Sequence, residues 1–228
     1  MIQEFFISFF GKPEGIIISQ LIISCQFTIY LSLIAFIGGG LIGVIITVLR
    51  IIPNKFLNTF SYCYTWLFQS VPLLMLLFLL GLGIPKLLER DIDPWLAASI
   101  ALIIFTSAYL SEVWRGSILA IPKGQWEAGF AFNFSFQQTL RLIILPQAFR
   151  YSVAPTISFL IQIIKGTSLA YIIGFHDLML IGKRWANAPV IGSEPYIIFP
   201  LMALFYFCLC YPLALLAKNL EKKSLSYD

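Results

Sequence analysis

The side chains that most often carry catalysis or hold metals are few and scattered in this sequence. His176 is the only histidine, and the four cysteines include no C-x-x-C pair. Zinc and haem sites need clusters of such ligands, so this spacing argues against them. The sequence also has no G-x-x-x-x-G-K-[ST] loop and no plausible pair of nucleophile and base. We therefore predict no catalytic, metal-binding or cofactor-binding residues in this chain.

Polar side chains concentrate instead in one stretch, residues 127–146, "EAGFAFNFSFQQTLRLIILP". This stretch is unusual because the chain around it is apolar. Of the 228 residues 59% are hydrophobic and only 11% are charged, whereas soluble domains carry about a quarter charged residues. The composition predicts an all-α integral membrane protein. The scattered Lys and Arg residues argue against nucleic acid as a partner.

Five segments are long and apolar enough to span a bilayer. They lie within residues 20–49, 60–82, 95–117, about 148–173, and 195–216. An odd number of spans places the two termini on opposite sides. With the N-terminus outside, the inner segments hold nine Lys and Arg residues and the outer segments five, so the positive-inside rule predicts a cytoplasmic C-terminus. No repeat or linker divides the chain, and we predict a single membrane domain, 1–228.

Residues 116–147 form the longest inner segment, and its first half predicts a short helix. Pro122 is tolerated in a first helical turn, where its missing N–H is not needed. The helix then runs from Lys123 to about Phe132. Asn133 follows it and favours the left-handed conformation of a helix C-cap.

A second short helix is predicted directly after this turn. Ser135 and Gln138 have the spacing of a capping box, which starts a helix over residues 136–145. Pro146 predicts a break or kink at the end of that helix. The first helix could lie on the inner leaflet, but it has few Lys and Arg residues for that. Its short apolar face and small residues favour docking into a groove of another protein.

These residues resemble a known signature. Glu127-Ala128-Gly129 and Ile143-x-Leu145-Pro146 are similar, in sequence and in spacing, to the EAA motif of importer-type ABC transporter permeases. Five stretches resemble the polar amino acid branch of that family: "FQSVPLL" at 68–74, "AYLSEVWRGSI" at 108–118, "IPKGQWEA" and "LPQAFR" around the EAA motif, and "IKGTSLAYIIG" at 164–174. The resemblance covers residues 17–222.

The resemblance implies a type I importer permease fold, with five transmembrane helices and a cytoplasmic coupling helix in a bacterial plasma (inner) membrane. Two such permease chains, identical or related, would form the translocation path for an amino acid. Two partner ATPase subunits would bind and hydrolyse ATP, and an extracytoplasmic binding protein would deliver the substrate. This chain itself would bind no cofactor.

The resemblance also assigns the ATPase-coupling role to the segment around Glu127. We expect Trp126 and Phe130 to be apolar anchors in the ATPase groove, and Glu127 to form an ion pair or cap at its edge. The alternative for Glu127 is an intrahelical pair with Lys123. The other residues assigned to coupling are Ala128, Gly129, Asn133, Leu145 and Pro146.

A second set of residues is predicted to line the translocation path. Lys165 lies inside the fourth span, where a cation is costly and usually faces a cavity or the bundle interior. Its partner could be a substrate carboxylate, although snorkelling or a structural hydrogen bond would also satisfy it. The remaining candidates are Gln162, Thr167, Ser168, Gln69 and Ser70. Glu112 and Arg115 are expected to form a local pair at the inner end of the third span.

The chain departs from the family pattern at three positions. Gly129 replaces an alanine, Asn133 replaces a glycine, and Gly166 replaces an aspartate beside Lys165, so a Lys–Asp pair cannot be transferred here. Two other functions are weighed. A membrane enzyme would need clustered acid and base groups, which the chain lacks. A permease-like ABC scaffold that signals without transport is disfavoured by the amino acid branch motifs and by Lys165.

Overall fold

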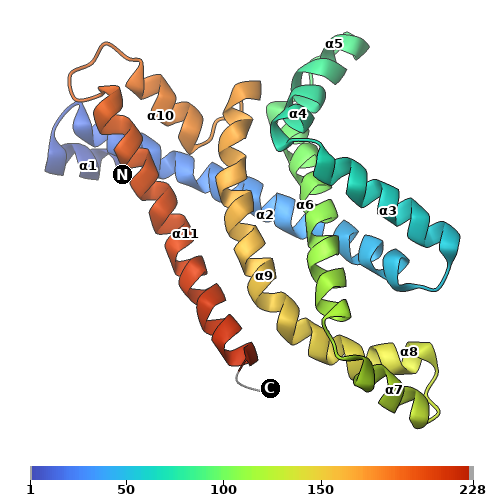
Figure 1. Cartoon of the computed structure of the whole chain (residues 1–228). Coiled ribbons are helices and arrows are strands. Elements are labelled where there is room, and N and C mark those ends of the chain that lie inside the picture. The colour runs from blue at the N-terminus through green and yellow to red at the C-terminus, as the bar shows by residue number, and fades with distance from the viewer. Residues whose placement is uncertain (1, 226–228) are drawn as a thin grey trace. The chain divides into compact units, whose positions relative to one another are not determined.

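The structure is a computed structural model that describes residues 2–225, and every regular element in that range is helical (Figure 1). The elements in chain order are α1 (Ile2–Phe10), α2 (Glu14–Ile51), α3 (Lys55–Ser70), α4 (Leu73–Phe78), π-helix η1 (Leu79–Gly83), α5 (Ile84–Leu88), α6 (Pro94–Leu119), α7 (Lys123–Ala131), α8 (Phe136–Thr139), π-helix η2 (Leu140–Ile144), α9 (Leu145–Gly166), 3-10 helix η3 (Thr167–Ile173), α10 (Leu178–Ala186) and α11 (Pro195–Leu225).

Four helical stretches are long and apolar enough to cross a membrane: Glu14–Ile51, Pro94–Leu119, Phe136–Ile173 and Pro195–Lys223. They contain the predicted first, third, fourth and fifth spans. The predicted second span corresponds to a sharply bent pair, Lys55–Ser70 with Leu73–Leu88, so the count is four, or five with this pair as one span. Pro72 lies at the break and is the N-cap of α4, as expected for a residue that lacks a backbone N–H.

Pro146 does not break the chain where the sequence predicts a break. The helix continues from α8 through η2 into α9, and Pro146 is the second residue of α9. A proline ring clashes with the carbonyl four residues before it in a regular α-helix. The wider π-turn at Leu140–Ile144 gives the ring room, and the same arrangement occurs where η1 precedes Pro85. The break predicted at Leu145 was therefore wrong, whereas the alternative, a kink, stays a prediction.

The chain divides into two compact units built from alternating stretches. Unit 1 comprises Met1–Ile37, Val71–Ile103 and Gln162–Pro212, and unit 2 comprises Gly38–Ser70, Ile104–Ile161 and Leu213–Asp228. The helices α2, α6, α9 and α11 each contribute residues to both units. Neither unit is therefore a contiguous segment of sequence, and the single membrane domain stays a prediction.

Each unit has its own apolar core. In unit 1, buried residues of α2, α10 and α11 pack together, among them Leu21, Leu178 and Ile198. In unit 2, Ile118 and Ile121 pack against Ile144 and Ala148, which joins the end of α6 to η2 and α9. This second core lies directly beside the hairpin formed by α7 and α8.

The turn between α7 and α8 has the predicted conformation. Asn133 has a φ of 62°, in the left-handed region. Ser135 accepts a hydrogen bond from the Gln138 backbone N–H, and the Gln138 side chain accepts one from the Ser135 N–H at 2.8 Å, so the capping box is complete. One detail differs, because Pro122 is the N-cap of α7 and lies outside its first turn.

Gly129 is the closest point of packing within the hairpin. It is buried and faces Thr139, which is completely buried. A Cβ atom at Gly129 would lie 2.5 Å from the Thr139 Cγ2 and 2.7 Å from its Oγ1. The absence of a side chain therefore allows α7 to approach α8.

We predict that Gly129→Ala lowers the stability of the permease and that Thr139→Ala restores it. Overpacking costs about 1–3 kcal/mol, and the better helix propensity of alanine offsets about 0.5–1 kcal/mol, which leaves a net loss of about 1 kcal/mol. Thermal unfolding of the purified protein in detergent measures the two single variants and the double variant. Gly124→Ala on the same helix is the control, because no atom lies within 4 Å of its added Cβ. Equal effects of the two glycine substitutions would contradict the packing argument.

Candidate functional site

The short helix α7 presents one face to its own chain and another outward. Gly129 is buried and Trp126 is half-buried, whereas Glu127 and Ala128 are exposed. Figure 1 shows α7 and α8 as a hairpin between α6 and α9. The residues assigned to ATPase coupling are therefore divided between the two faces of the helix.

Trp126 belongs to the inward face. It packs against the unit 2 core around Ile118 and Ile144, and its ring stacks on Phe136 with 5.7 Å between centroids. Trp126 stays half-exposed beside this core, and its expected role as an anchor in an ATPase groove stays a prediction. The packed ring of Trp126 holds α7 against the core of unit 2. Gly129 lies on the same inward face and is buried against Thr139.

Glu127 lies on the outward face. Within the part of the chain that the structure describes, its carboxylate has no ion-pair partner, and Lys123 does not pair with it. The intrahelical alternative is therefore not formed. An exposed carboxylate without a partner remains available to a second protein.

Three aromatic side chains project around the left-handed turn at Asn133. Phe130 is 50% exposed, Phe132 is 77% exposed and Phe134 is 36% exposed. Phe130 matches its predicted outward position, whereas Phe132 and Phe134 were missed. Their alternation in "FAFNF" was a usable signal, because a charge-poor polar turn rarely needs three phenylalanines unless a partner covers them.

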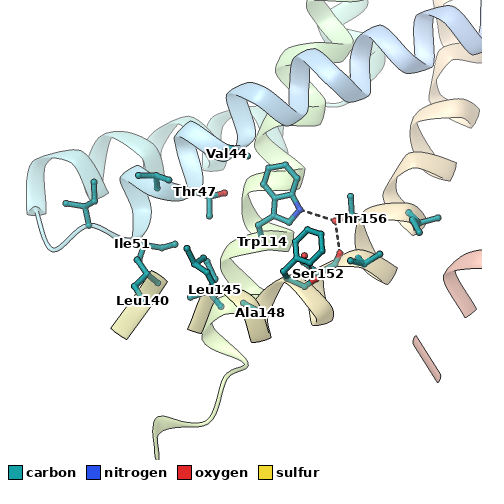
Figure 2. A pocket seen from close by; sticks show the side chains of 15 residues that line it. Val44, Thr47, Ile51, Trp114, Leu140, Leu145, Ala148, Ser152 and Thr156 are labelled. Carbon is teal, nitrogen blue, oxygen red and sulfur yellow. Dashed lines mark hydrogen bonds between the residues drawn. The ribbon is translucent and has the colours of Figure 1, made fainter. Parts of the chain in front are cut away.

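Leu145 and Pro146 lie apart from this outward face, at the start of α9. Leu145 lines an apolar pocket of about 610 Å³ between α2, α6 and α9. Figure 2 shows Trp114 donating to Thr156, which in turn donates to the Ser152 carbonyl. The Thr47 and Ser152 hydroxyls in the pocket are also bonded to backbone carbonyls. The polar hydrogens of these pocket side chains are therefore already donated within the chain.

Four of the predicted path residues belong to unit 1. Lys165 and Gln162 are exposed in this chain, and Lys165 has no ion pair among the described residues. Thr167 is buried, and its hydroxyl donates to the Ile164 carbonyl at 2.7 Å. Ser168 donates to the Lys165 carbonyl at 2.6 Å. Lys165 and Gln162 therefore keep their polar groups available, whereas both hydroxyls have already donated their protons within the chain.

Gln69 and Ser70 belong to unit 2, at the end of α3. The Gln69 amide donates to the Ala108 carbonyl at 3.1 Å, and its backbone carbonyl accepts from Tyr109. Ser70 donates to the Trp66 carbonyl at 2.7 Å. Gln69 therefore ties α3 to α6, and its amide N–H is committed to structure.

Residues of α2, α3 and α6 meet at a cluster of charges in unit 2. Glu112 and Arg115 form the predicted local pair, with the Arg115 Nη2 2.6 Å from the Glu112 Oε2. The other carboxylate oxygen lies 3.0 Å from the Nη1 of Arg50. The same Nη1 donates to the Thr65 hydroxyl at 2.9 Å, and the guanidinium lies over the Tyr62 ring.

Arg50 is the member of this cluster that sequence reasoning missed, because its partners are far away in the chain. Its side chain is only 10% exposed. A guanidinium suits this position because its donors are fixed in a plane and can serve two helices at once. Ile51, the next residue, packs against the core that holds Trp126, so the charge cluster and the base of α7 are neighbours.

We predict that Arg50→Gln destabilises the permease more than Arg115→Gln does. Arg50 joins three helices with charge-assisted hydrogen bonds, each worth about 1.5–3 kcal/mol, whereas an i,i+3 pair contributes about 0.2–0.5 kcal/mol. Denaturation midpoints in detergent provide the comparison. Arg50→Lys keeps the charge without the planar fork and should fall between the two. A larger loss from Arg115→Gln would contradict this account of the cluster.

The chain shares its sequence pattern with transport proteins. Residues 39–225 match the family described as binding-protein-dependent transport system inner membrane component. The L-cystine transport system permease protein TcyB of Bacillus subtilis (strain 168) is 34% identical over 201 residues, which cover 86% of this chain and 83% of that protein. The probable glutamine ABC transporter permease protein GlnM of the same strain is 32% identical over 196 residues, with 86% and 89% covered.

The fold is similar to that of a solved transporter. A chain from the crystal structure of an amino acid ABC transporter with histidines superposes with a TM-score of 0.83 at 24% identity, covering 90% of this chain and 94% of that one. The predicted all-α importer permease fold is thereby confirmed. From the family match and the identity to its relatives, this chain belongs to the family of inner membrane components of binding-protein-dependent transport systems.

Proposed function

We propose that this chain is the membrane-spanning permease subunit of an ATP-driven amino acid importer. Family membership makes it a membrane component of a transport system, and relatives named as cystine and glutamine permeases support an amino acid as its substrate. Two partner ATPase subunits supply the energy, since this sequence has no phosphate-binding loop. A second permease chain, identical or related, and an extracytoplasmic binding protein complete the transporter.

The outward face of α7 is the single observation that carries this proposal. It combines the unpaired carboxylate of Glu127, the small side chain of Ala128 and the exposed ring of Phe130, and the exposed ring of Phe132 follows directly after the helix. Exposed aromatic residues on a compact helical hairpin are typical anchors in a partner's groove. Ala128 allows the partner's surface to approach the helix backbone closely. We assign this face to the ATPase.

The inward face of α7 explains how an ATPase movement reaches the membrane helices. Trp126 packs into the core formed by the ends of α6, η2 and α9. Gly129 lies against Thr139 of α8, and the Gln147 side chain donates to that of Gln125 at 3.2 Å. Because these contacts are tight, a displacement of α7 moves the base of unit 2 with it.

The orientation in the bacterial plasma (inner) membrane follows from charge. With an external N-terminus, α7 and α8 face the cytoplasm, where an ATPase is available. The inner segments then carry nine Lys and Arg residues against five outside, in agreement with the positive-inside rule. The loop between α9 and α11, which contains α10, then lies on the outer side.

We predict that Glu127→Lys and Phe132→Ala each weaken ATPase association about tenfold or more. The first change reverses the charge at the edge of the contact, and the second removes an aromatic anchor of the kind that contributes about 2 kcal/mol or more to an interface. The measurement is the amount of ATPase subunit that co-purifies with the tagged permease, together with transport in reconstituted vesicles.

Glu221→Lys is a matched control, because it makes the same charge change at an exposed position of α11. It should leave association unchanged. Unfolding temperatures of the variants should equal that of the wild type, since neither Glu127 nor Phe132 is buried. Normal co-purification and transport by both Glu127→Lys and Phe132→Ala would refute the proposed docking face.

A further inference from the structure

Two cations on the last turn of α10, in unit 1, lack a counter-charge. Among the described residues neither Lys183 nor Arg184 has a carboxylate partner. The Lys183 ammonium lies 3.3 Å from the Tyr171 hydroxyl and 4.6 Å from the centre of its ring. The Arg184 Nη2 lies 3.2 Å from the Nε2 of His176.

These contacts hold the two side chains in place without neutralising them. A guanidinium can only donate, so the His176 Nε2 must accept, and the imidazole contributes no negative charge. The Tyr171 ring attracts the ammonium through its quadrupole but carries no net charge. The two cations therefore present a charge of +2 at one place.

Asp177, the acid closest to them in sequence, is not their counter-ion. Its carboxylate is completely buried at the N-cap of α10, where Oδ1 accepts from the Leu180 N–H at 2.9 Å. Burial raises the pKa of Asp177 to about 7, and backbone N–H groups oppose that rise. Asp177 therefore supplies no carboxylate to Lys183 and Arg184, which lie in the last turn of α10.

The cations border a hollow of about 770 Å³ that is also lined by Tyr171, Ile172, Leu180 and Asn187. The hollow is widely open to solvent and is large enough for a small molecule to lie in it. The lining combines a cationic end, a polar amide and an apolar wall. A carboxylate with an organic side chain attached has the complementary chemistry.

We propose that this pocket binds the carboxylate of an amino acid on the outer side of the transporter, with Lys183 as the main partner and Arg184 as the second. The proposal rests on the function and orientation proposed above. Outer loops usually carry few cations, so two adjacent ones without a carboxylate partner, beside a hollow, favour an external anion. Lys183 is half-buried beside the hollow, which favours a small ligand over a flat protein surface.

The test is equilibrium binding of a panel of radiolabelled L-amino acids, with cystine included, to the purified permease–ATPase complex. The proposal expects Lys183→Gln to weaken binding at least tenfold and Lys183→Arg to restore much of it. The N-acetyl derivative of the bound amino acid, which keeps the carboxylate, should compete with it. The amide derivative, which lacks the carboxylate, should not compete.

Lys86→Gln is the matched control, because Lys86 is an exposed lysine of α5 in the same unit, and it should leave binding unchanged. Three outcomes would overturn the proposal: no binding of any amino acid, equal affinity of wild type and Lys183→Gln, or loss of binding with Lys165→Gln but not with Lys183→Gln. Unchanged binding with reduced uptake driven by the binding protein would assign the cations to an acidic protein surface instead. The ATPase co-purification test above is independent of every one of these outcomes.

Discussion

The Arg50 guanidinium, at the end of α2, joins three helices at one point, and the architecture of unit 2 depends on this contact. Arg50 belongs to α2, and one nitrogen of its guanidinium contacts both Glu112 of α6 and Thr65 of α3. In a membrane, apolar side chains give helices little reason to prefer each other over lipid, so polar contacts and close packing determine the arrangement. Ile51, the next residue of α2, packs against the apolar core that also holds Trp126.

Many polar groups of this chain are used within its own structure, whereas others remain without a partner in the described residues. Most of the hydroxyls and amides among the described residues bond to backbone carbonyls, as Thr167, Ser168 and Gln69 do. Several charged side chains, in contrast, have no partner of opposite charge. Glu127 on α7, Lys165 at the end of α9 and Lys183 on α10 are charged groups without an ion pair in the described chain, and in our account each meets a partner or a substrate.

Local features could be predicted from the sequence because their physics is local. The left-handed Asn133 and the Ser135–Gln138 capping box depend only on neighbouring backbone. The direction of each α7 side chain could not be predicted, since it depends on packing against Ile144 and Thr139, which belong to other elements. Pro146 shows the same limit: the π-turn that accommodates it is a property of the whole helix. The α10 helix was missed, although Asp177 before an apolar run is a usable N-cap signal.

The most direct test of the account is photo-cross-linking from position 132 in the assembled transporter. A photoreactive phenylalanine analogue at Phe132 should cross-link to the ATPase subunit, because this ring projects from the turn after α7 and is 77% exposed. The same analogue at Phe207, which is exposed on the apolar helix α11, should cross-link to lipid or permease only. ATPase cross-links from position 207 and none from position 132, in a complex that still hydrolyses ATP and transports, would contradict the assignment of α7 as the coupling surface.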